Sequence, residues 1–350
     1  MRLYNKSHEN YCGIDLHTKM MYVCILSNEG KILLHKNIST SADQFLALIK
    51  PYRKDLVVGV ECIFSWYWLA DLCADEDIEF ILGHALYMKC IHGGKTKNDK
   101  IDSEKIAKLI RGGNFPLAYV YPREQRAVRD LLRRRMYLVR ARGECQAHIK
   151  ITNYQYNLPA FEKKLERKNN RTNVPERFTD VDVRKNVEVD LSIMDHLTEQ
   201  IKALEYYIIR HAKKIDPRTF FRLRSVPGIG EILAMVMLYE VQDIQRFPTV
   251  QSFCSYARLV KCPKESAGQR YGFSGAKIGN AHLKWAFSEA TILFMRESDR
   301  AKRFVAKYEK KHGKGKAISI LTHKLGRAVY TLWKRNDAFD EKYFFANIKL

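Results

Sequence analysis

Several features are missing from the sequence, and each absence excludes a class of protein. The eight cysteines form no CxxC pair, so neither a zinc site nor a disulfide framework is expected, and the thiols are predicted to be reduced core residues. No apolar run reaches the ~20 residues that a bilayer crossing needs, and the first residues lack a signal-type apolar region. Internal repeats are also absent. Together these absences predict a cytoplasmic protein without a membrane partner.

Positive charge is abundant in an otherwise ordinary composition. The 350 residues include 61 Lys and Arg against 39 Asp and Glu, which gives a net charge of +22. Such an excess is typical of proteins that bind a polyanion, most often a nucleic acid. The charge is also clustered, because residues 123–150 contain nine Lys and Arg but only three Asp and Glu. Clustering favours nucleic-acid binding over solubility alone.

Residues 1–121 are predicted to form an α/β domain, because short apolar runs alternate with helical patterns. The segment 11–38 has the pattern of three short strands, and "DLVVGVEC" and "EFILGHAL" have that of buried strands. The stretches "SADQFLALIK", "SWYWLADLCADE" and "DSEKIAKLIRGG" predict helices. Ser41 is the expected N-cap of the first helix, with Gln44 at the capping-box position.

The remainder of the chain predicts helices. Residues 122–215 contain a long basic helix, a polar loop and a second long helix, which favours an antiparallel helical hairpin. The second helix has apolar residues at alternating spacings of three and four, as in a coiled coil, and this seam would pack within the hairpin or against a second copy of the chain. The seam comprises Met194, Leu197, Ile201, Leu204 and Ile208. Residues 216–350 predict an all-α domain.

Four acidic residues stand where predicted strands end or a helix begins. Asp15 follows "CGI", Glu61 closes "VVGVE", and Asp99 and Asp102 lie three residues apart at a helix start. Carboxylates that converge at one sheet edge would hold Mg²⁺, and such ions assist phosphodiester cleavage. For single residues the alternatives stay open: Glu61 could mark where a strand meets solvent, and Asp99 or Asp102 could be the helix N-cap.

The order of these residues resembles the RuvC-like (RNase H-like) catalytic domain of the DEDD insertion-sequence transposases. That family includes Piv-type DNA invertases and bridge-RNA-guided recombinases. The matching stretches are "GID" at Asp15, the Glu61 that follows a later apolar strand, and "KTKNDKID", which ends at Asp102. The resemblance implies that the four carboxylates are catalytic metal ligands. It also implies DNA, a guide RNA and further copies of the chain, as a dimer or tetramer, as partners.

A Pro-Gly-Ile-Gly turn precedes an apolar helix in the C-terminal half. Gly228 and Gly230 would leave backbone amides directed at solvent, where a DNA phosphate can bind, as in a helix-hairpin-helix element. A turn that only packs two helices together is the alternative. The GxGxxG spacing of a dinucleotide-binding fold is incomplete here.

The segment "CPKESAGQRYGFSGAKIGNAHLKW" offers two candidate nucleophiles, Ser266 and Ser274. A serine that attacks phosphorus needs an activating group and nearby cations, and Lys264, Arg270 and Lys277 could supply the cations. Chemistry alone does not separate the two serines. The family resemblance extends to this segment and implies Ser266, although the family's Ser-Gly turn is Ser-Ala-Gly here.

These features favour a recombinase in which the acidic domain and Ser266 form one composite site and a 5′-phosphoserine link to DNA is made. The basic helix would bind RNA through residues such as Arg133, Arg134 and Arg135. A metal-dependent junction nuclease that uses water as its nucleophile is the alternative enzyme. A non-catalytic nucleic-acid-binding protein is the third hypothesis.

Overall fold

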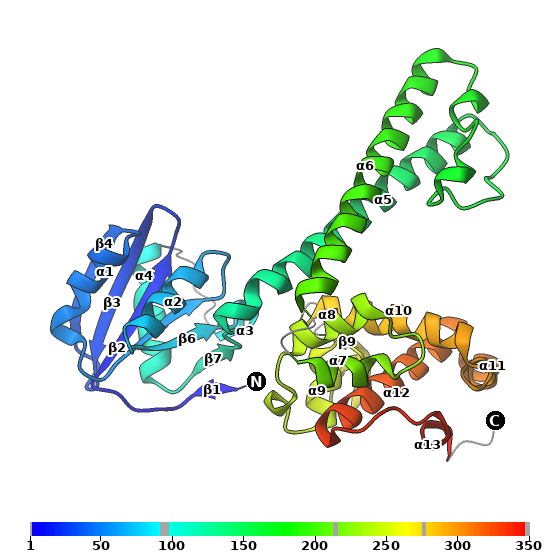
Figure 1. Cartoon of the computed structure of the whole chain (residues 1–350). Coiled ribbons are helices and arrows are strands. Elements are labelled where there is room, and N and C mark those ends of the chain that lie inside the picture. Colours follow the sequence, from blue (N-terminus) through cyan, green and yellow to red (C-terminus); the bar gives the residue numbers. More distant parts are fainter. Residues whose placement is uncertain (1, 92–97, 213–215, 275–277, 347–350) are drawn as a thin grey trace. The chain divides into compact units, whose positions relative to one another are not determined.

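The computed structural model describes residues 2–91, 98–212, 216–274 and 278–346. The chain divides into two units, Met1–Glu124 and Gln125–Leu350 (Figure 1). The positive charge is distributed very unequally between them. The first unit contains 16 of the 61 basic and 15 of the 39 acidic residues, which leaves +21 of the +22 net charge in the second. The predicted division at residues 122 and 216 stays a prediction.

The first unit is built on a mixed seven-stranded sheet with the order β1-β7-β6-β5-β2-β3-β4. β2, β3 and β4 are antiparallel neighbours, whereas β5 and β6 run parallel to β2. The strands predicted from the sequence are present, and the short β1 and β7 are additional. The bounds are β1 Leu3–Tyr4, β2 Asn10–Leu16, β3 Met20–Ser27, β4 Ile32–Ser39, β5 Leu56–Glu61, β6 Glu79–Gly83 and β7 Phe115–Ala118.

Helices cover both faces of this sheet. α1 (Ala42–Ile49) and α2 (Trp66–Asp75) pack on one face, in a core that contains Ile14 and Val58. α4 (Asp99–Arg111) packs on the other face, in a core that contains Tyr11 and Val57. Side chains alternate between the two faces along each strand, so the odd-numbered residues of β2 and β5 face α4. A short helix, α3 (Ala85–Ile91), follows β6.

The capping box predicted for α1 is wrong. Ser41 does precede the helix, but its side chain makes no cap hydrogen bond. Gln44 instead accepts a hydrogen bond at Oε1 from the backbone N–H of Ser39, at 3.2 Å. Gln44 bonds to Ser39 rather than to Ser41 because of how the chain enters the helix. The N–H of Thr40 donates to the carbonyl of Lys19 (2.9 Å), which holds residues 39–40 beside the sheet and within reach of Gln44.

The second unit begins with the helical hairpin expected from the sequence. α5 (Arg123–Gln155) and α6 (Val181–Ala212) lie side by side (Figure 1). Cross-helix contacts show that they are antiparallel, because residues later in α5 meet residues earlier in α6. Arg135 pairs with Glu205 (2.7 Å), Arg142 donates to Thr198 (3.3 Å), and His148 pairs with Asp190 (2.5 Å). Of the predicted seam, Met194, Ile201 and Ile208 are buried. Its role as a coiled coil between copies stays a prediction.

The C-terminal part is mostly helical but is not the all-α domain that the sequence predicted. β8 (Cys262–Ser266) and β9 (Gln269–Ser274) form an antiparallel hairpin within it. Gly268 lies in the tight turn between the two strands, Gly272 lies within β9, and Gly279 precedes the N-cap of α10. The helices are α7 Pro217–Arg224, α8 Glu231–Val241, α9 Val250–Tyr256, α10 Ala281–Glu297, α11 Asp299–His312, α12 Lys314–Arg335 and α13 Glu341–Phe345. Within the described ranges we find no helix with the length and apolar character of a membrane span.

Candidate active site

Asp15 and Glu61 lie at the same end of two neighbouring parallel strands. Ile14 of β2 is paired with Val60 of β5, and each acidic residue comes one position later. Gly13 and Gly59, two residues earlier on each strand, both face α4. Because side chains alternate along a strand, Asp15 and Glu61 lie on that same face.

The N-terminus of α4 is held close to this sheet edge. A Cβ at Gly13 would lie 2.3 Å from the backbone N of Ala107 and 2.3 Å from the carbonyl oxygen of Ser103, so only glycine allows α4 to pack this closely on β2. His35 of β4 contacts the first turn of α4 through Nε2, at 2.9 Å from the Lys100 carbonyl oxygen. Strand β2 and the start of α4 are therefore fixed relative to each other.

The cap of α4 is neither of the two acidic candidates. Asn98 is the N-cap, and its side chain accepts a hydrogen bond from the backbone N–H of Lys100 at 3.0 Å. Asp99 and Asp102 occupy the first turn. There the positive end of the helix dipole favours negative charge. The capping alternative for Asp99 and Asp102 is thus excluded.

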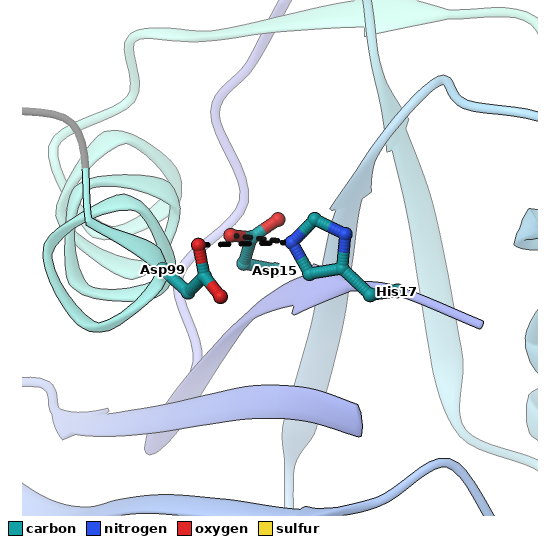
Figure 2. Close-up of side chains that lie close together, drawn as sticks. All are labelled: Asp15, His17 and Asp99. Atoms are coloured by element: carbon teal, nitrogen blue, oxygen red, sulfur yellow. Dashed lines mark ion pairs between the residues drawn. The ribbon is translucent and has the colours of Figure 1, made fainter. Parts of the chain in front are cut away.

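Three ligand-type side chains meet at this position (Figure 2). His17 Nε2 lies 3.3 Å from Asp15 Oδ2 and 3.8 Å from Asp99 Oδ1. One ligand atom from each of the three residues lies within 4.8 Å of the others. His17 was not among the predicted site residues. It follows Asp15 by two positions, and residues two apart on a strand lie on the same face of the sheet, so this spacing could have indicated it.

Glu61 and Asp102 lie outside this three-residue group, as judged from the part of the chain that the structure describes. Asp102 accepts a hydrogen bond at Oδ1 from Lys105 Nζ at 3.2 Å. It is still near enough for its charge to act on Asp15. The structure therefore brings Asp15 and Asp99 together directly, with Asp102 and Glu61 at the same edge of the sheet.

The electrostatics of the group favour a cation. Burial raises the pKa of Asp15, and the negative charges of Asp99 and Asp102 raise it further, while His17 opposes both effects. A cation bound beside Asp15 would stabilise the ionised form of its carboxyl group. Two carboxylates and one imidazole are donors that divalent cations accept, and the oxygen donors suit Mg²⁺ or Mn²⁺. The residues present therefore fit a divalent metal.

The second candidate region is the β8–β9 hairpin, which carries both serines. Ser266 is paired with Gln269, so Ala267 and Gly268 form a two-residue turn. Both have positive φ, 50° and 75°, as in the type I′ turn that suits a β-hairpin. Ser266 is exposed beside this turn. Ser274 is paired with Cys262 at the opposite end of the hairpin, so the two serines are well separated.

The three predicted cations of this loop differ in their surroundings. Lys264 is exposed on β8. Arg270 is also exposed, but it pairs across the strands with Glu265, with 2.6 Å between Nε and Oε1. Lys277 lies outside the described residues. Lys264 and Arg270 are thus the cations that can be placed on the hairpin with Ser266.

A buried ion network anchors the chain just after the hairpin. Asn280 caps α10 and donates from Nδ2 to Glu240 Oε2 at 2.7 Å. Glu240 is 1% exposed and also accepts from Arg129 (3.1 Å) and Arg133 (2.7 Å) of α5. Burial acts to raise the pKa of Glu240, but the two arginines and Asn280 outweigh it and lower the pKa to about 2. The network fixes α5, α8 and the start of α10 together.

The glycine turn between α7 and α8 is partly a packing feature. A Cβ at Gly228 would lie 2.3 Å from the backbone N of Phe294, so glycine is needed for contact with α10. The Gly228 N–H donates to Glu297 Oε2 at 3.0 Å and is not free for a phosphate. Gly230 is exposed and is the N-cap of α8. Phosphate binding therefore stays a proposal for Gly230 alone.

The three arginines predicted to bind RNA have different environments. Arg133 belongs to the Glu240 network, and the Arg135 side chain is 15% exposed and pairs with Glu205. Arg134 is exposed and lies over the ring of Tyr137, with 5.4 Å from its Cζ to the ring centroid. Arg134 is the most exposed of the three, the Arg133 side chain is 35% exposed, and RNA binding by these residues stays a prediction.

Both candidate regions lie in parts of the chain that are similar to known proteins. A family model of IS110-type DEDD transposases, described as "Transposase", matches residues 12–153, and the model "Transposase IS116/IS110/IS902 family" matches residues 221–306. The transposase for insertion sequence element IS1328 of Yersinia enterocolitica is 23% identical over 339 residues, which is 94% of this chain and 98% of that protein. An IS110 43.6 kDa protein of Streptomyces coelicolor is 29% identical over 157 residues, 43% of this chain and 37% of that protein. The acidic group lies inside the first matched region and the serine hairpin inside the second, and the chain belongs to the IS110 family of transposases, enzymes that cut and rejoin DNA.

Proposed function

We propose that this transposase moves an insertion sequence by exchanging DNA strands, with Ser266 as nucleophile and a Mg²⁺ site at Asp15, Glu61, Asp99 and Asp102. The observation that carries the proposal is the meeting of Asp15, His17 and Asp99 ligand atoms within 4.8 Å. The strand order β4-β3-β2-β5-β6, antiparallel and then parallel, supports a RuvC-like (RNase H-like) identity for the first unit. Helices α7 and α8 with Gly230 are proposed as a helix-hairpin-helix element.

The residues of the first unit would hold the metal and place it. Asp15 and Asp99 are the direct ligands, and His17 is a third donor beside them. Glu61 and Asp102 add negative charge at the same edge. When bound, the divalent ion would activate the attacking hydroxyl and offset charge on the phosphoryl oxygens. The proposal requires these groups and Ser266 to act on one phosphodiester bond.

Each step of the serine reaction forms one phosphate ester bond for every one that it breaks. Ser266 Oγ loses its proton and bonds to phosphorus while the P–O3′ bond breaks, and the departing oxygen takes up a proton as a 3′-hydroxyl. The 5′ phosphate stays on the serine. A 3′-hydroxyl from another strand then attacks the phosphorus, which restores a phosphodiester and frees Ser266. Lys264 and Arg270 would offset the charge on the phosphoryl group. No outside reactant is consumed.

A comparison of Ser266→Ala with Ser274→Ala tests the nucleophile. Both substitutions remove one hydroxyl from the same hairpin, so Ser274→Ala is the matched control. We expect Ser266→Ala to abolish strand exchange and the covalent protein–DNA adduct seen on a denaturing gel, while Ser274→Ala retains both. DNA binding should be unchanged in each variant.

These two variants, together with Asp15→Asn, distinguish the proposal from the alternative functions. A junction nuclease that uses water would keep cutting DNA after Ser266→Ala. Loss of adduct in Ser274→Ala alone would assign the other serine. Strand exchange that survives Asp15→Asn would contradict a metal-dependent reaction of any kind at this site.

We also propose that a guide RNA selects the DNA sites and that the active enzyme is a dimer or tetramer. The +21 charge of Gln125–Leu350 supports binding of a second polyanion besides DNA. Sequencing of RNA that co-purifies with the full chain tests the guide. An RNA that maps beside the transposase gene supports it, and strand exchange by RNA-free protein would contradict it.

A further inference from the structure

A cavity of about 680 Å³ lies between α12, the segment that follows it, and α13. This volume is within the range of ligand-binding pockets, about 300–1,000 Å³. The residues that line the cavity all belong to the second unit and include none of those proposed for catalysis. Its function is therefore a separate question from the strand-exchange chemistry.

The walls combine cations with aromatic rings. Lys324, Arg327 and Arg335 line the cavity from one helix, α12. Phe339, Tyr343 and Phe344 line it from the segment beyond. Tyr343 is 75% exposed, whereas Phe344 is buried and has the Lys324 Nζ 4.6 Å from its ring centroid. The Tyr343 ring is thus accessible for stacking on a ligand, whereas the Phe344 ring is part of the cavity wall.

The aromatic wall is held in place by hydrogen bonds to α7. Asn336 accepts from Arg222 at 2.9 Å, and the Phe339 N–H donates to Ser225 Oγ at 2.8 Å. Asp340 caps α13 by accepting from the Tyr343 N–H at 3.1 Å. One of the two acidic residues of the cavity, Asp340, therefore has a structural partner, and the three cations exceed the acidic charge.

We propose that this cavity binds one unpaired nucleotide of a DNA or RNA strand, with its base against Tyr343 and its phosphate beside Arg327 and Arg335. An aromatic platform next to cations is the usual arrangement for single-stranded nucleic acid, because every base has a face that stacks. A base-paired duplex presents no free base face to Tyr343. The surroundings are complementary in charge, since residues 301–350 contain 13 Lys and Arg against four Asp and Glu.

Binding of labelled oligomers to the full chain in EDTA tests this proposal without any cleavage chemistry. The probes are a single-stranded oligothymidylate, an oligouridylate of equal length and a duplex. We expect Tyr343→Ala to weaken single-strand binding about tenfold, and Tyr343→Phe, which keeps the ring, to bind like the parent. Duplex binding should not change. A preference between the two single strands identifies the strand as DNA or RNA.

The cations are tested by the double variant Arg327→Ala, Arg335→Ala. Its matched control is Arg296→Ala, Arg303→Ala, two exposed arginines of α10 and α11 outside the cavity. We expect the first pair, and not the second, to reduce the slope of log affinity against log salt for single strands by about 0.7, because one phosphate is no longer neutralised. Equal binding by Tyr343→Ala and the parent protein would overturn the proposal. So would an equal loss on duplex DNA, or displacement of the oligomer by a free mononucleotide at similar concentration. A failure of Ser266 as nucleophile would leave all these results unaffected.

Discussion

Gly13 shows how a single residue without a side chain can determine the geometry of the acidic group. Because a Cβ there would lie 2.3 Å from backbone atoms of α4, Gly13→Ala should force the helix away from β2. We expect it to lower the free energy of unfolding by at least about 2 kcal/mol. We also expect strand exchange to fall about a hundredfold, because Asp99 would move away from Asp15. Chemical denaturation and hydrogen exchange of α4 measure the structural effect.

Gly143 provides the matched control. It lies inside α5, and a Cβ there would meet nothing within 4 Å. Alanine is preferred over glycine in a helix, so Gly143→Ala should stabilise the protein by about 0.8 to 1 kcal/mol. Equal effects of the two substitutions would contradict the close packing of α4 on β2.

Asp15 is expected to reduce stability when no metal is bound. Its pKa is raised above the ordinary 3.8, first by burial, so the native state binds the proton more tightly than the unfolded state does. As the pH rises from 3.8 through the raised pKa, the native state loses stability relative to the unfolded chain. At neutral pH, Asp15→Asn should therefore raise the melting temperature in EDTA by about 1 to 2 °C.

Added Mg²⁺ should reverse this order. Metal binding stabilises only a native state that holds the metal, so the parent protein should gain more from Mg²⁺ than Asp15→Asn does. Asn is nearly the same size as Asp and keeps one oxygen, so packing is preserved. Equal Mg²⁺ effects in the two proteins would show that Asp15 is not a ligand.

At the residue scale, the sequence predicts the acidic group better than it predicts its supporting residues. Asp15, Asp99 and Asp102 could be recognised because acidic residues at strand and helix ends are unusual and their order resembles a family. Asn98 as cap and His17 as neighbour depend on where the first turn of α4 begins and on how it packs against β2. Both depend on tertiary structure, which a local sequence pattern does not predict.

Helix α8 ends in a buried carboxylate that connects it to two other helices. Glu240→Gln would remove the carboxylate charge that Arg129 and Arg133 share, and Arg129 is only 10% exposed. Removing one partner of a buried pair costs about 3 to 5 kcal/mol. The pKa of Glu240 is lowered from 4.5 to about 2, so its stabilisation is complete above about pH 4.5. The difference between parent and Glu240→Gln should shrink as the pH falls from 4.5 towards 2.

Asp299 is a suitable control for the same measurement. It pairs with Lys302 at 2.7 Å, but its side chain is 84% exposed, and exposed pairs add little. Asp299→Asn should change the unfolding curve far less than Glu240→Gln does at every pH. A pH-independent difference for Glu240→Gln would contradict the lowered pKa of Glu240.

The long elements were predictable, whereas the serine hairpin was not. α5 and α6 carry helical apolar stripes over many turns, and their pattern outweighs local exceptions. The hairpin is short, and its strands include Pro263, Lys264 and Glu265 but no β-branched residue, so the local signal for a strand is weak. Its turn is also atypical, because Ala267 has a φ of 50° where Gly or Asn is usual. Glu265 and Arg270 pair across the strands, but a Glu and an Arg five residues apart are common in loops and do not by themselves indicate a strand.

The whole molecule separates two kinds of surface. The first unit, with the acidic group, is almost neutral, and the second unit carries nearly the entire net charge. Total composition indicated a nucleic-acid partner, and the basic residues clustered at 123–150 already indicated that the charge lies beyond the first unit. We therefore expect the second unit to be the part of the chain that attracts DNA.

This separation predicts a strong and localised salt dependence. If six to ten phosphates are contacted, affinity for DNA should fall about 10³- to 10⁵-fold between 50 and 200 mM salt. The second unit has four exposed lysines close together in sequence, Lys310, Lys311, Lys314 and Lys316. Changing all four to Gln should lower the slope of log affinity against log salt by about 0.9 for every phosphate that is no longer neutralised. Fluorescence anisotropy with labelled duplex DNA in EDTA measures the slope.

Four exposed lysines of the first unit form the matched set, with the same change in total charge: Lys19, Lys31, Lys36 and Lys50. If binding depended only on the net charge of the chain, both sets would lower affinity equally. If phosphates bind mainly to the second unit, the slope should change for its set alone, because counterions are released only where phosphates are neutralised. Equal slopes for the two sets would therefore contradict the assignment of DNA binding to Gln125–Leu350.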